Sequence, residues 1–247
     1  MKKIVLLLIC SGVVFAATLK LAVAANVGYA IKPLIRAYKK QHPETDITFT
    51  LGSSGKLFAQ ISHGASYDVF LCANMSYPQA LYKNGKALER PKVYAMGSLV
   101  ILSRKPRKMD TSLEFLLSKE IKKIAIANPK TAPYGKAALE VLQHKGYAQR
   151  LGRKFVFGES VGQTYIYAQK VCDVGFVAKS LLCTPKNKHL KEGREYITVD
   201  KNLYTPIKQG VVIVQKTPNK ELAKDFVAFL FSLEAKEILR SYGYSVE

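Results

Sequence analysis

Short apolar runs of strand length alternate along the chain with stretches whose apolar residues recur at helical spacing. The strand-like runs are 19–25 (LKLAVAA), 46–51 (DITFTL), 67–73 (YDVFLCA), 122–127 (KKIAIA), 154–157 (KFVF), 174–178 (VGFVA) and 196–199 (YITV). Helical patterns follow most of these runs, and a further helical pattern covers 219–242. This alternation is typical of an α/β protein with mostly parallel sheets.

The order of the runs predicts two sheets and therefore two lobes. We expect lobe I to contain residues 17–97 and 207–247, and lobe II to contain residues 98–206. The apolar strand IKQGVVIVQK at 207–216 would carry the chain back into lobe I. Two crossings between lobes predict a hinge. A single doubly wound sheet is the alternative that the pattern leaves open.

Two helix starts carry specific expectations. Pro33 lies inside the first helical pattern, where proline removes a backbone hydrogen bond, so this helix is expected to start late or distorted. Ser76 precedes the helical pattern SYPQALYKNG and is expected to be its N-cap.

The N-terminus has the pattern of a secretory signal peptide, which we expect to span residues 1–16. Lys2 and Lys3 precede an apolar run, and small residues surround Ala16. The run is too short to span a bilayer comfortably. Lipidation at Cys10 is the alternative, although the preceding Ile9 fits a lipoprotein signal poorly. The mature protein is therefore expected to be periplasmic and soluble.

The formal net charge is +20, which would fit a nucleic-acid partner. However, the lysines are scattered singly or in pairs, without a basic arm, zinc ligands or an RNA-binding aromatic motif. Export also argues against nucleic acid. A generally basic surface that steers a small anion is the better interpretation.

Cysteines and histidines give no catalytic or metal-binding pattern. Without Cys10, three cysteines remain, an odd count that excludes a fully paired disulfide framework. Cys72 is expected to be a buried thiol, while a disulfide between Cys172 and Cys183 stays open. The four histidines are isolated in sequence and are interpreted as surface residues.

Four strand-to-helix junctions share one chemistry. They are AANVG at 24–28, GSSG at 52–55, APYG at 132–135 and ESVG at 159–162. A helix N-terminus offers unpaired N–H groups and partial positive charge, and glycine lets a ligand approach the backbone. Because such junctions lie at the carboxyl ends of parallel strands, four of them could form a neutral cage for a small oxyanion. Ordinary helix capping is the alternative at each single junction.

Nucleotide binding and hydrolysis are not supported. GSSGKL lacks the spacing of a phosphate-binding P-loop, and Leu57 stands where that motif needs Ser or Thr. The chain also has no Gly-x-Ser-x-Gly elbow and no recognisable Ser, His and Asp set. We therefore expect no enzyme; an α/β hydrolase or transferase with this layout is the less favoured alternative.

The chain resembles the periplasmic molybdate-binding proteins of ABC transporters (the ModA family) from about Leu19 to Tyr244. The landmarks are AVAAN, GSSGKLFAQISHGASYDVFLCAN, GSLVIL, IAIANPKTAPYGKAALEVL and FLFSLEAKEILRSYGY, of which the block at 52–74 is the most specific. The resemblance implies a two-lobed type II binding-protein fold that closes on a tetrahedral oxyanion and serves a membrane permease.

Position by position, the resemblance implies that Asn26, Ser54, Tyr134 and Val161 bind the anion. Ser54 would contribute its hydroxyl and backbone N–H, Tyr134 and Val161 their backbone N–H groups, while Ser53 would help the turn. Some relatives carry a ligand-binding Tyr where this chain has Ala178, and the Tyr134 hydroxyl could replace that contact. Lys208 and Gln209 also interrupt a crossing strand that is usually more apolar.

The expected ligand is molybdate, together with tungstate, and no separate cofactor or metal-ion ligand is expected. These anions are fully deprotonated and need only donors, whereas phosphate keeps a proton and needs an acceptor, which the centres of the four junctions lack. Sulfate remains an alternative that differs in size. The protein is expected to act as a monomer.

Overall fold

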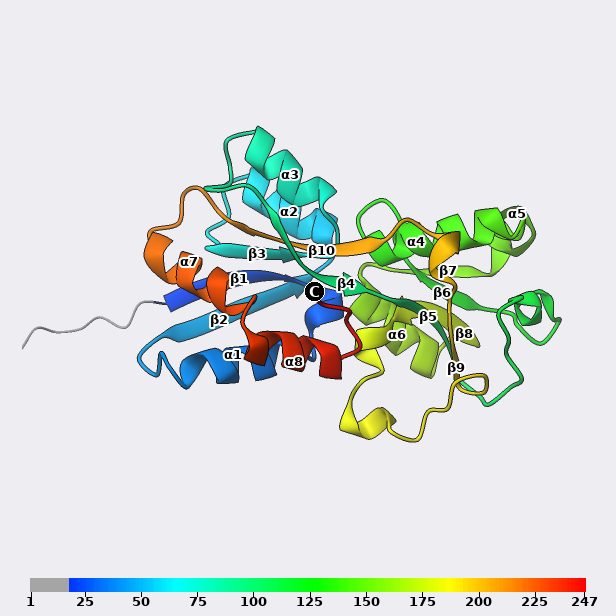
Figure 1. The fold of residues 1–247 in the computed structure, drawn as a ribbon. Coiled ribbons are helices and arrows are strands. Elements are labelled where there is room, and N and C mark those ends of the chain that lie inside the picture. The colour runs from blue at the N-terminus through cyan, green and yellow to red at the C-terminus, as the bar shows by residue number, and fades with distance from the viewer. Residues whose placement is uncertain (1–17) are drawn as a thin grey trace, which may run out of the picture.

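The computed structural model describes residues 18–247 and shows two lobes, each built on a five-stranded sheet (Figure 1). The predicted signal peptide and the alternative lipidation site at Cys10 lie outside the described residues. Within residues 18–247, no helix has the length and apolar character needed to cross a membrane.

The lobe I sheet has the strand order β2-β1-β3-β10-β4. Its strands are β1 (Thr18–Ala24), β2 (Asp46–Gly52), β3 (Val69–Cys72), β4 (Lys92–Gly97) and β10 (Ile207–Ile213). β1 pairs in parallel with β2 and β3, while β10 is antiparallel to β3 and β4. The sheet is therefore mixed, with a parallel half formed by the three strands that carry βα junctions.

The lobe II sheet repeats this arrangement with the order β7-β6-β8-β5-β9. Its strands are β5 (Leu99–Ser103), β6 (Ile124–Ala127), β7 (Phe155–Gly158), β8 (Val174–Ala178) and β9 (Tyr196–Thr198). β6 pairs in parallel with β7 and β8, and β5 is antiparallel to β8 and β9. The two-lobed α/β fold expected from the sequence is confirmed.

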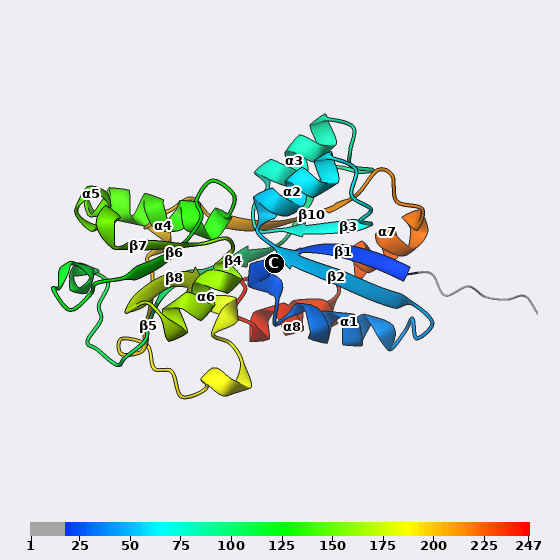
Figure 2. The same cartoon turned by 180° about the vertical axis from the view of Figure 1, so that it is seen from behind.

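Helices cover both faces of the lobe I sheet (Figure 2). They are α1 (Ile31–Lys39), α2 (Ser54–Ser62), α3 (Ser76–Lys83), α7 (Lys220–Phe229) and α8 (Leu233–Ser241). Leu21 and Val23 of β1 pack with α1, α7 and α8, whereas Ala22 between them packs with α2 and α3. This alternation follows from the period of two along a strand and makes β1 buried on both faces.

Lobe II contains the helices α4 (Pro133–His144), α5 (Ala148–Leu151) and α6 (Val161–Lys170). Short 3-10 helices complete the two lobes: η1 (Ala25–Val27), η2 (Glu114–Leu117), η3 (Gly152–Lys154), η4 (Lys179–Leu181), η5 (Pro185–Asn187) and η6 (Lys201–Leu203). The core of lobe II extends to Ala24 and Ala73, which end or follow lobe I strands, so the two lobes share a packed boundary.

Two segments connect the lobes side by side. β4 ends at Gly97 and β5 begins at Leu99, so a single residue separates strands of different sheets. The return segment is β10, whose register with β4 shifts between Gln209 and Gly210. Figure 1 shows both strands running from one lobe toward the other. An irregular antiparallel pair of this kind is a suitable hinge, because a bulge locally loosens the ladder.

The helix starts differ from expectation in one case. α1 begins late, at Ile31, and Pro33 is its third residue, where no intrahelical N–H bond is needed. Ser76, in contrast, is not an N-cap: α3 begins at Ser76, and the preceding Asn74 accepts a 3.4 Å hydrogen bond from the Tyr77 N–H. That prediction was wrong because an amide two residues upstream supplies the acceptor.

The C-terminal helical pattern is divided between α7 and α8. Ser232 stands between them and caps α8, since its hydroxyl accepts a 3.2 Å hydrogen bond from the Ala235 N–H. The possible disulfide between Cys172 and Cys183 is not formed, and Cys72 is also a free thiol.

Candidate anion-binding site

Strand register brings the four junctions together in pairs. In lobe I, Ala24 of β1 is paired with Gly52 of β2, so the AANVG and GSSG junctions leave the sheet as neighbours. In lobe II, Ala127 of β6 is paired with Gly158 of β7, which places the APYG and ESVG junctions side by side. Each lobe therefore presents two junctions at the carboxyl ends of its parallel strands.

Contacts between the lobes join these two pairs. The Gly55 N–H donates a 2.8 Å hydrogen bond to the Thr131 carbonyl oxygen, next to the APYG junction. The Ser180 hydroxyl, on η4 of lobe II, donates a 2.8 Å hydrogen bond to the Asn26 carbonyl oxygen. The structure thus shows the lobes closed on each other, with the predicted site residues at their boundary.

The four residues predicted to bind the anion are all buried at this boundary. Asn26, Ser54 and Tyr134 are each 1% exposed, and Val161 is 4% exposed. Since they come from η1, α2, α4 and α6, their burial depends on both lobes. A ligand held among them would be inaccessible until the lobes separate.

Three helices begin at this boundary with N–H groups that lack an acceptor within the helix. Ser54 and Val161 are the first residues of α2 and α6, and Tyr134 is the second residue of α4, after Pro133. N–H groups at these positions have no acceptor within their own helix, and the helix ends carry partial positive charge. Together they provide donors for an anion without a formal positive charge.

The Ser54 hydroxyl adds a side-chain donor. Its oxygen accepts a 3.0 Å hydrogen bond from the Ala73 N–H, which follows β3. A serine hydroxyl that accepts in this way still has its own proton to donate. The contact with Ala73 therefore fixes the position of the oxygen, and the hydroxyl proton is left to donate to the neighbouring Cys72 sulfur or to a ligand.

Ser53 shapes the turn through its backbone. It is the N-cap of α2 with an extended conformation (φ −67°, ψ 146°), but its side chain makes no capping hydrogen bond. Its hydroxyl oxygen is buried and has no hydrogen-bond partner among the described residues.

Asn26 uses its side-chain donors within the protein. Its Nδ2 donates to Gln209 Oε1 at 2.7 Å and to the Tyr244 hydroxyl at 2.8 Å. The Tyr244 hydroxyl in turn donates to the Asn26 carbonyl oxygen at 3.0 Å. Because both Nδ2 protons are engaged, Asn26 in this orientation can offer an anion only its backbone N–H.

The Tyr134 ring points toward the crossing strands. A Cβ atom added to Gly97 would meet the Tyr134 hydroxyl, and the same hydroxyl lies beside the Asn26 side chain. Burial, followed by the proximity of Tyr244, raises the pKa of Tyr134 well above its ordinary value, so the hydroxyl remains a protonated donor.

Position 178 provides no polar group. Ala178 is the last residue of β8 and is fully buried. A polar contact near this position comes from Ser180, two residues further along the chain, whose hydroxyl donates to the Asn26 carbonyl oxygen.

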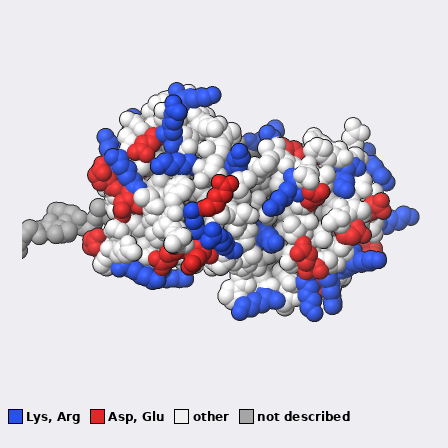
Figure 3. Space-filling model, in the orientation of Figure 1, with Lys and Arg blue, Asp and Glu red and all other residues white. Residues whose placement is uncertain are grey.

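An exposed ion pair beside the junctions links the two lobes. Glu159 in the ESVG junction pairs with Lys56 at 2.6 Å, and both side chains are more than half exposed. An ion pair this exposed contributes little to stability, but it spans the two lobes and neutralises the junction's carboxylate. On the face seen in Figure 3, Lys and Arg are scattered over both lobes with acidic residues among them.

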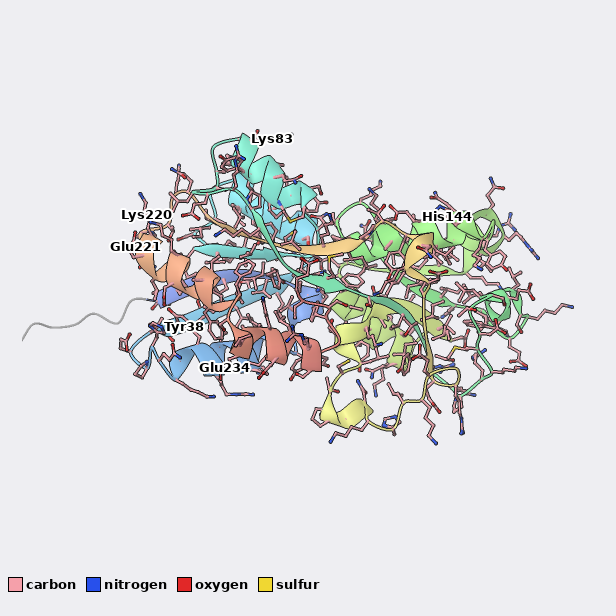
Figure 4. The ribbon with its side chains drawn as sticks, in the orientation of Figure 1. Tyr38, Lys83, His144, Lys220, Glu221 and Glu234 are labelled. Atoms are coloured by element: carbon pink, nitrogen blue, oxygen red, sulfur yellow. The ribbon has the colours of Figure 1, made fainter. Side chains whose placement is uncertain are left out.

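His144 and Tyr38 lie away from this boundary. Figure 4 shows His144 on α4, at the end of the helix opposite Tyr134, and Tyr38 on α1 of lobe I. A ring nitrogen of His144 lies 2.7 Å from the Leu203 carbonyl oxygen, and the Tyr38 hydroxyl donates to Asp225 at 2.8 Å. Residues 18–247 contain no cluster of His, Cys, Asp and Glu suited to a metal ion.

Sequence reasoning missed three residues that contact Asn26: Ser180, Gln209 and Tyr244. The signal for Gln209 was present, because a polar pair in an apolar crossing strand requires an explanation. Ser180 and Tyr244 had no such signal, since small polar and aromatic residues are common after strands and helices.

Comparison with known proteins identifies the family. A family model described as bacterial extracellular solute-binding protein matches residues 19–245. The chain belongs to this family. The molybdate-binding protein of Rhodobacter capsulatus is 37% identical over 228 residues, covering 92% of this chain and 87% of that protein. The corresponding protein of Azotobacter vinelandii is 35% identical, with 94% and 91% coverage.

Solved structures agree with this assignment. The periplasmic molybdate-binding protein of Azotobacter vinelandii superimposes with a TM-score of 0.87 and 33% identity, covering 93% of this chain and 99% of that one. A sulfate-binding protein of Mycobacterium tuberculosis matches with a TM-score of 0.77 at 14% identity, which supports the shared fold alone.

Proposed function

We propose that this protein is the solute-binding component of an ABC importer and that it captures molybdate between its two lobes. Its relatives in two bacteria are molybdate-binding proteins that match it over nearly the whole described chain. Tungstate, a tetrahedral dianion of the same kind, is proposed as a second ligand. The ligand would then pass to a permease in the inner membrane.

The single observation that carries this proposal is the convergence of unpaired helix N-termini at one buried boundary. Ser54, Tyr134 and Val161 offer backbone donors from α2, α4 and α6, and Ser54 adds a hydroxyl. A fully deprotonated oxyanion needs such donors and no acceptor. Phosphate carries a proton near neutral pH, and the junction carboxylate of Glu159 is turned to Lys56.

Binding and release follow from the two-lobed arrangement. An anion that contacts both lobes has higher affinity for the closed state and shifts the equilibrium toward it. No group in this scheme breaks or forms a covalent bond, so we propose a transport protein without catalytic activity. We further propose that the mature protein is periplasmic, monomeric and free of a resident cofactor.

A thermal-shift screen tests this function. The purified mature protein is heated with molybdate, tungstate, sulfate or phosphate at equal concentrations. A ligand that binds only the folded state raises Tm by mass action. We expect large shifts with molybdate and tungstate and none with phosphate. A dominant sulfate shift would favour the alternative ligand, and no shift with any anion would refute the proposal.

A further inference from the structure

A buried polar network lies behind the anion site, and Gln209 of β10 is its centre. Gln209 is completely buried. Its Oε1 accepts a 2.7 Å hydrogen bond from Asn26 Nδ2, and its own Nε2 donates to the Ile207 carbonyl oxygen at 3.0 Å. Both ends of this amide are therefore engaged, one with a site residue and one with the crossing strand.

Gln209 lies in the hinge strand, so its hydrogen bond to Asn26 connects the hinge with a predicted site residue. The register between β10 and β4 shifts directly after Gln209, at the crossing between lobes. A buried polar side chain in an otherwise apolar strand requires hydrogen-bond partners, and Asn26 provides one. The hinge strand and the AANVG junction are thus held together by side chains.

Tyr134 of lobe II also lies beside this network. A Cβ atom on Gly97 would lie 2.8 Å from Gln209 Nε2 and would also meet the Tyr134 hydroxyl, so these groups converge on Gly97. The Tyr134 hydroxyl and Asn26 Oδ1 are both buried, and neither has a hydrogen-bond partner among residues 18–247. The Tyr134 hydroxyl nevertheless lies close to the Asn26 side chain, so buried polar groups of both lobes meet at Asn26.

We infer that Gln209 is a positioning residue for the anion site. It holds the Asn26 amide with Nδ2 turned toward the hinge strand. This orientation engages the amide protons within the protein and leaves the Asn26 backbone N–H for the ligand, while the Tyr134 hydroxyl of lobe II lies beside the same side chain. The inference rests on the proposed function, because it assigns Gln209 a role in binding the same anion.

The test is a double-mutant cycle on the affinity for molybdate. Calorimetry gives the Kd of wild type, Gln209→Met, Tyr134→Phe and the double variant, and unfolding gives the Tm of each ligand-free protein. Gln215→Leu, an exposed glutamine just after β10, is the matched control. A network hydrogen bond corresponds to a roughly 2- to 13-fold change in Kd.

We expect Gln209→Met and Tyr134→Phe each to weaken binding within that range, and the double variant to weaken it by less than the product of the two. A purely structural role would lower Tm and leave Kd unchanged. Unchanged affinity in Gln209→Met, or independent effects in the double variant, would overturn the inference. If Gln209→Met does not fold, Tyr134→Phe decides, and unchanged affinity there overturns it. Absence of molybdate binding by wild type would instead refute the proposed function, and this inference with it.

Discussion

The Gly55 N–H donates a 2.8 Å hydrogen bond to the carbonyl oxygen of Thr131, and the two residues belong to different lobes. Gly55 is the second residue of α2, directly after Ser54. A Cβ atom at position 55 would lie 2.8 Å from the Tyr77 hydroxyl, 2.9 Å from Thr131 Cα and 3.0 Å from the Thr131 oxygen. The absence of a side chain at Gly55 is thus a condition for the closed state.

Gly55→Ala is therefore expected to weaken molybdate binding at least about tenfold, as closure would lose a hydrogen bond and meet a steric clash. Calorimetry measures the affinity, and small-angle scattering measures compaction on ligand addition. Gly152→Ala is the control, since a Cβ atom there meets nothing within 4 Å. Wild-type affinity and full compaction in Gly55→Ala would contradict the closed arrangement.

Ser54 and Ser53 are expected to differ in both affinity and stability. Ser54→Ala removes a donor to the anion, and a hydrogen bond to a charged group corresponds to a roughly 10- to 150-fold loss of affinity. It also leaves the buried Ala73 N–H unpaired, so the ligand-free protein should lose about 1–3 kcal/mol. Ser53→Ala removes a hydroxyl without a partner among the described residues and should leave both quantities nearly unchanged. Equal affinity losses in the two variants would reverse these roles.

Gly97 is expected to be intolerant of a side chain because of Tyr134. Gly97→Ala would place a Cβ atom against the Tyr134 hydroxyl and 2.8 Å from Gln209 Nε2, so molybdate binding should fall at least about tenfold. Adding Tyr134→Phe removes the nearest clashing atom and should restore part of the affinity. Calorimetry on the single and double variants measures this. A double variant that binds more weakly than Gly97→Ala would show that the clash is not the cause.

The protein is expected to lose stability at alkaline pH. Burial raises the pKa of the Cys72 thiol from 9.0 to about 12, and burial also raises the pKa values of Tyr94 and Tyr134. Between pH 9 and 12 the unfolded chain loses these protons while the folded chain keeps them, so the free energy of unfolding falls as pH rises. One such group contributes a slope of up to about 1.4 kcal/mol per pH unit.

Denaturant unfolding at several pH values from 7 to 11 measures this slope. Cys72→Ala is expected to have a shallower slope than wild type above pH 9. A free energy of unfolding that stays constant to pH 11 would show that these groups ionise as readily in the folded state as in the unfolded state.

Much of the fold was predictable because its signals are local. β1 and β2 have strand-length apolar runs, and the GSSG and APYG junctions carry recognisable turn residues. The closed geometry depends on register and on lobe contacts, which no local pattern encodes. Ser180 and Tyr244 reach Asn26 from positions 154 and 218 residues away, so their roles appear only in three dimensions.

The predicted site residues also divide into those with a local sequence signal and those whose role depends on three-dimensional contacts. The position of Ser54 and Val161 at helix starts could be predicted from the junctions, and both are the first residues of their helices. The orientation of the Asn26 and Tyr134 side chains could not be predicted, because it depends on Gln209 and Gly97 in the hinge. The Ser76 prediction failed for a related reason, as the acceptor at that helix start comes from Asn74.

The most direct test of molybdate capture is a calorimetric titration of the wild-type mature protein with molybdate, repeated in the presence of an equal concentration of sulfate or of phosphate. We expect one molybdate per chain, bound with little change in affinity in the presence of phosphate and more tightly than sulfate. Absence of a molybdate signal, or its complete suppression by phosphate at equal concentration, would contradict a donor-only cage for a deprotonated oxyanion.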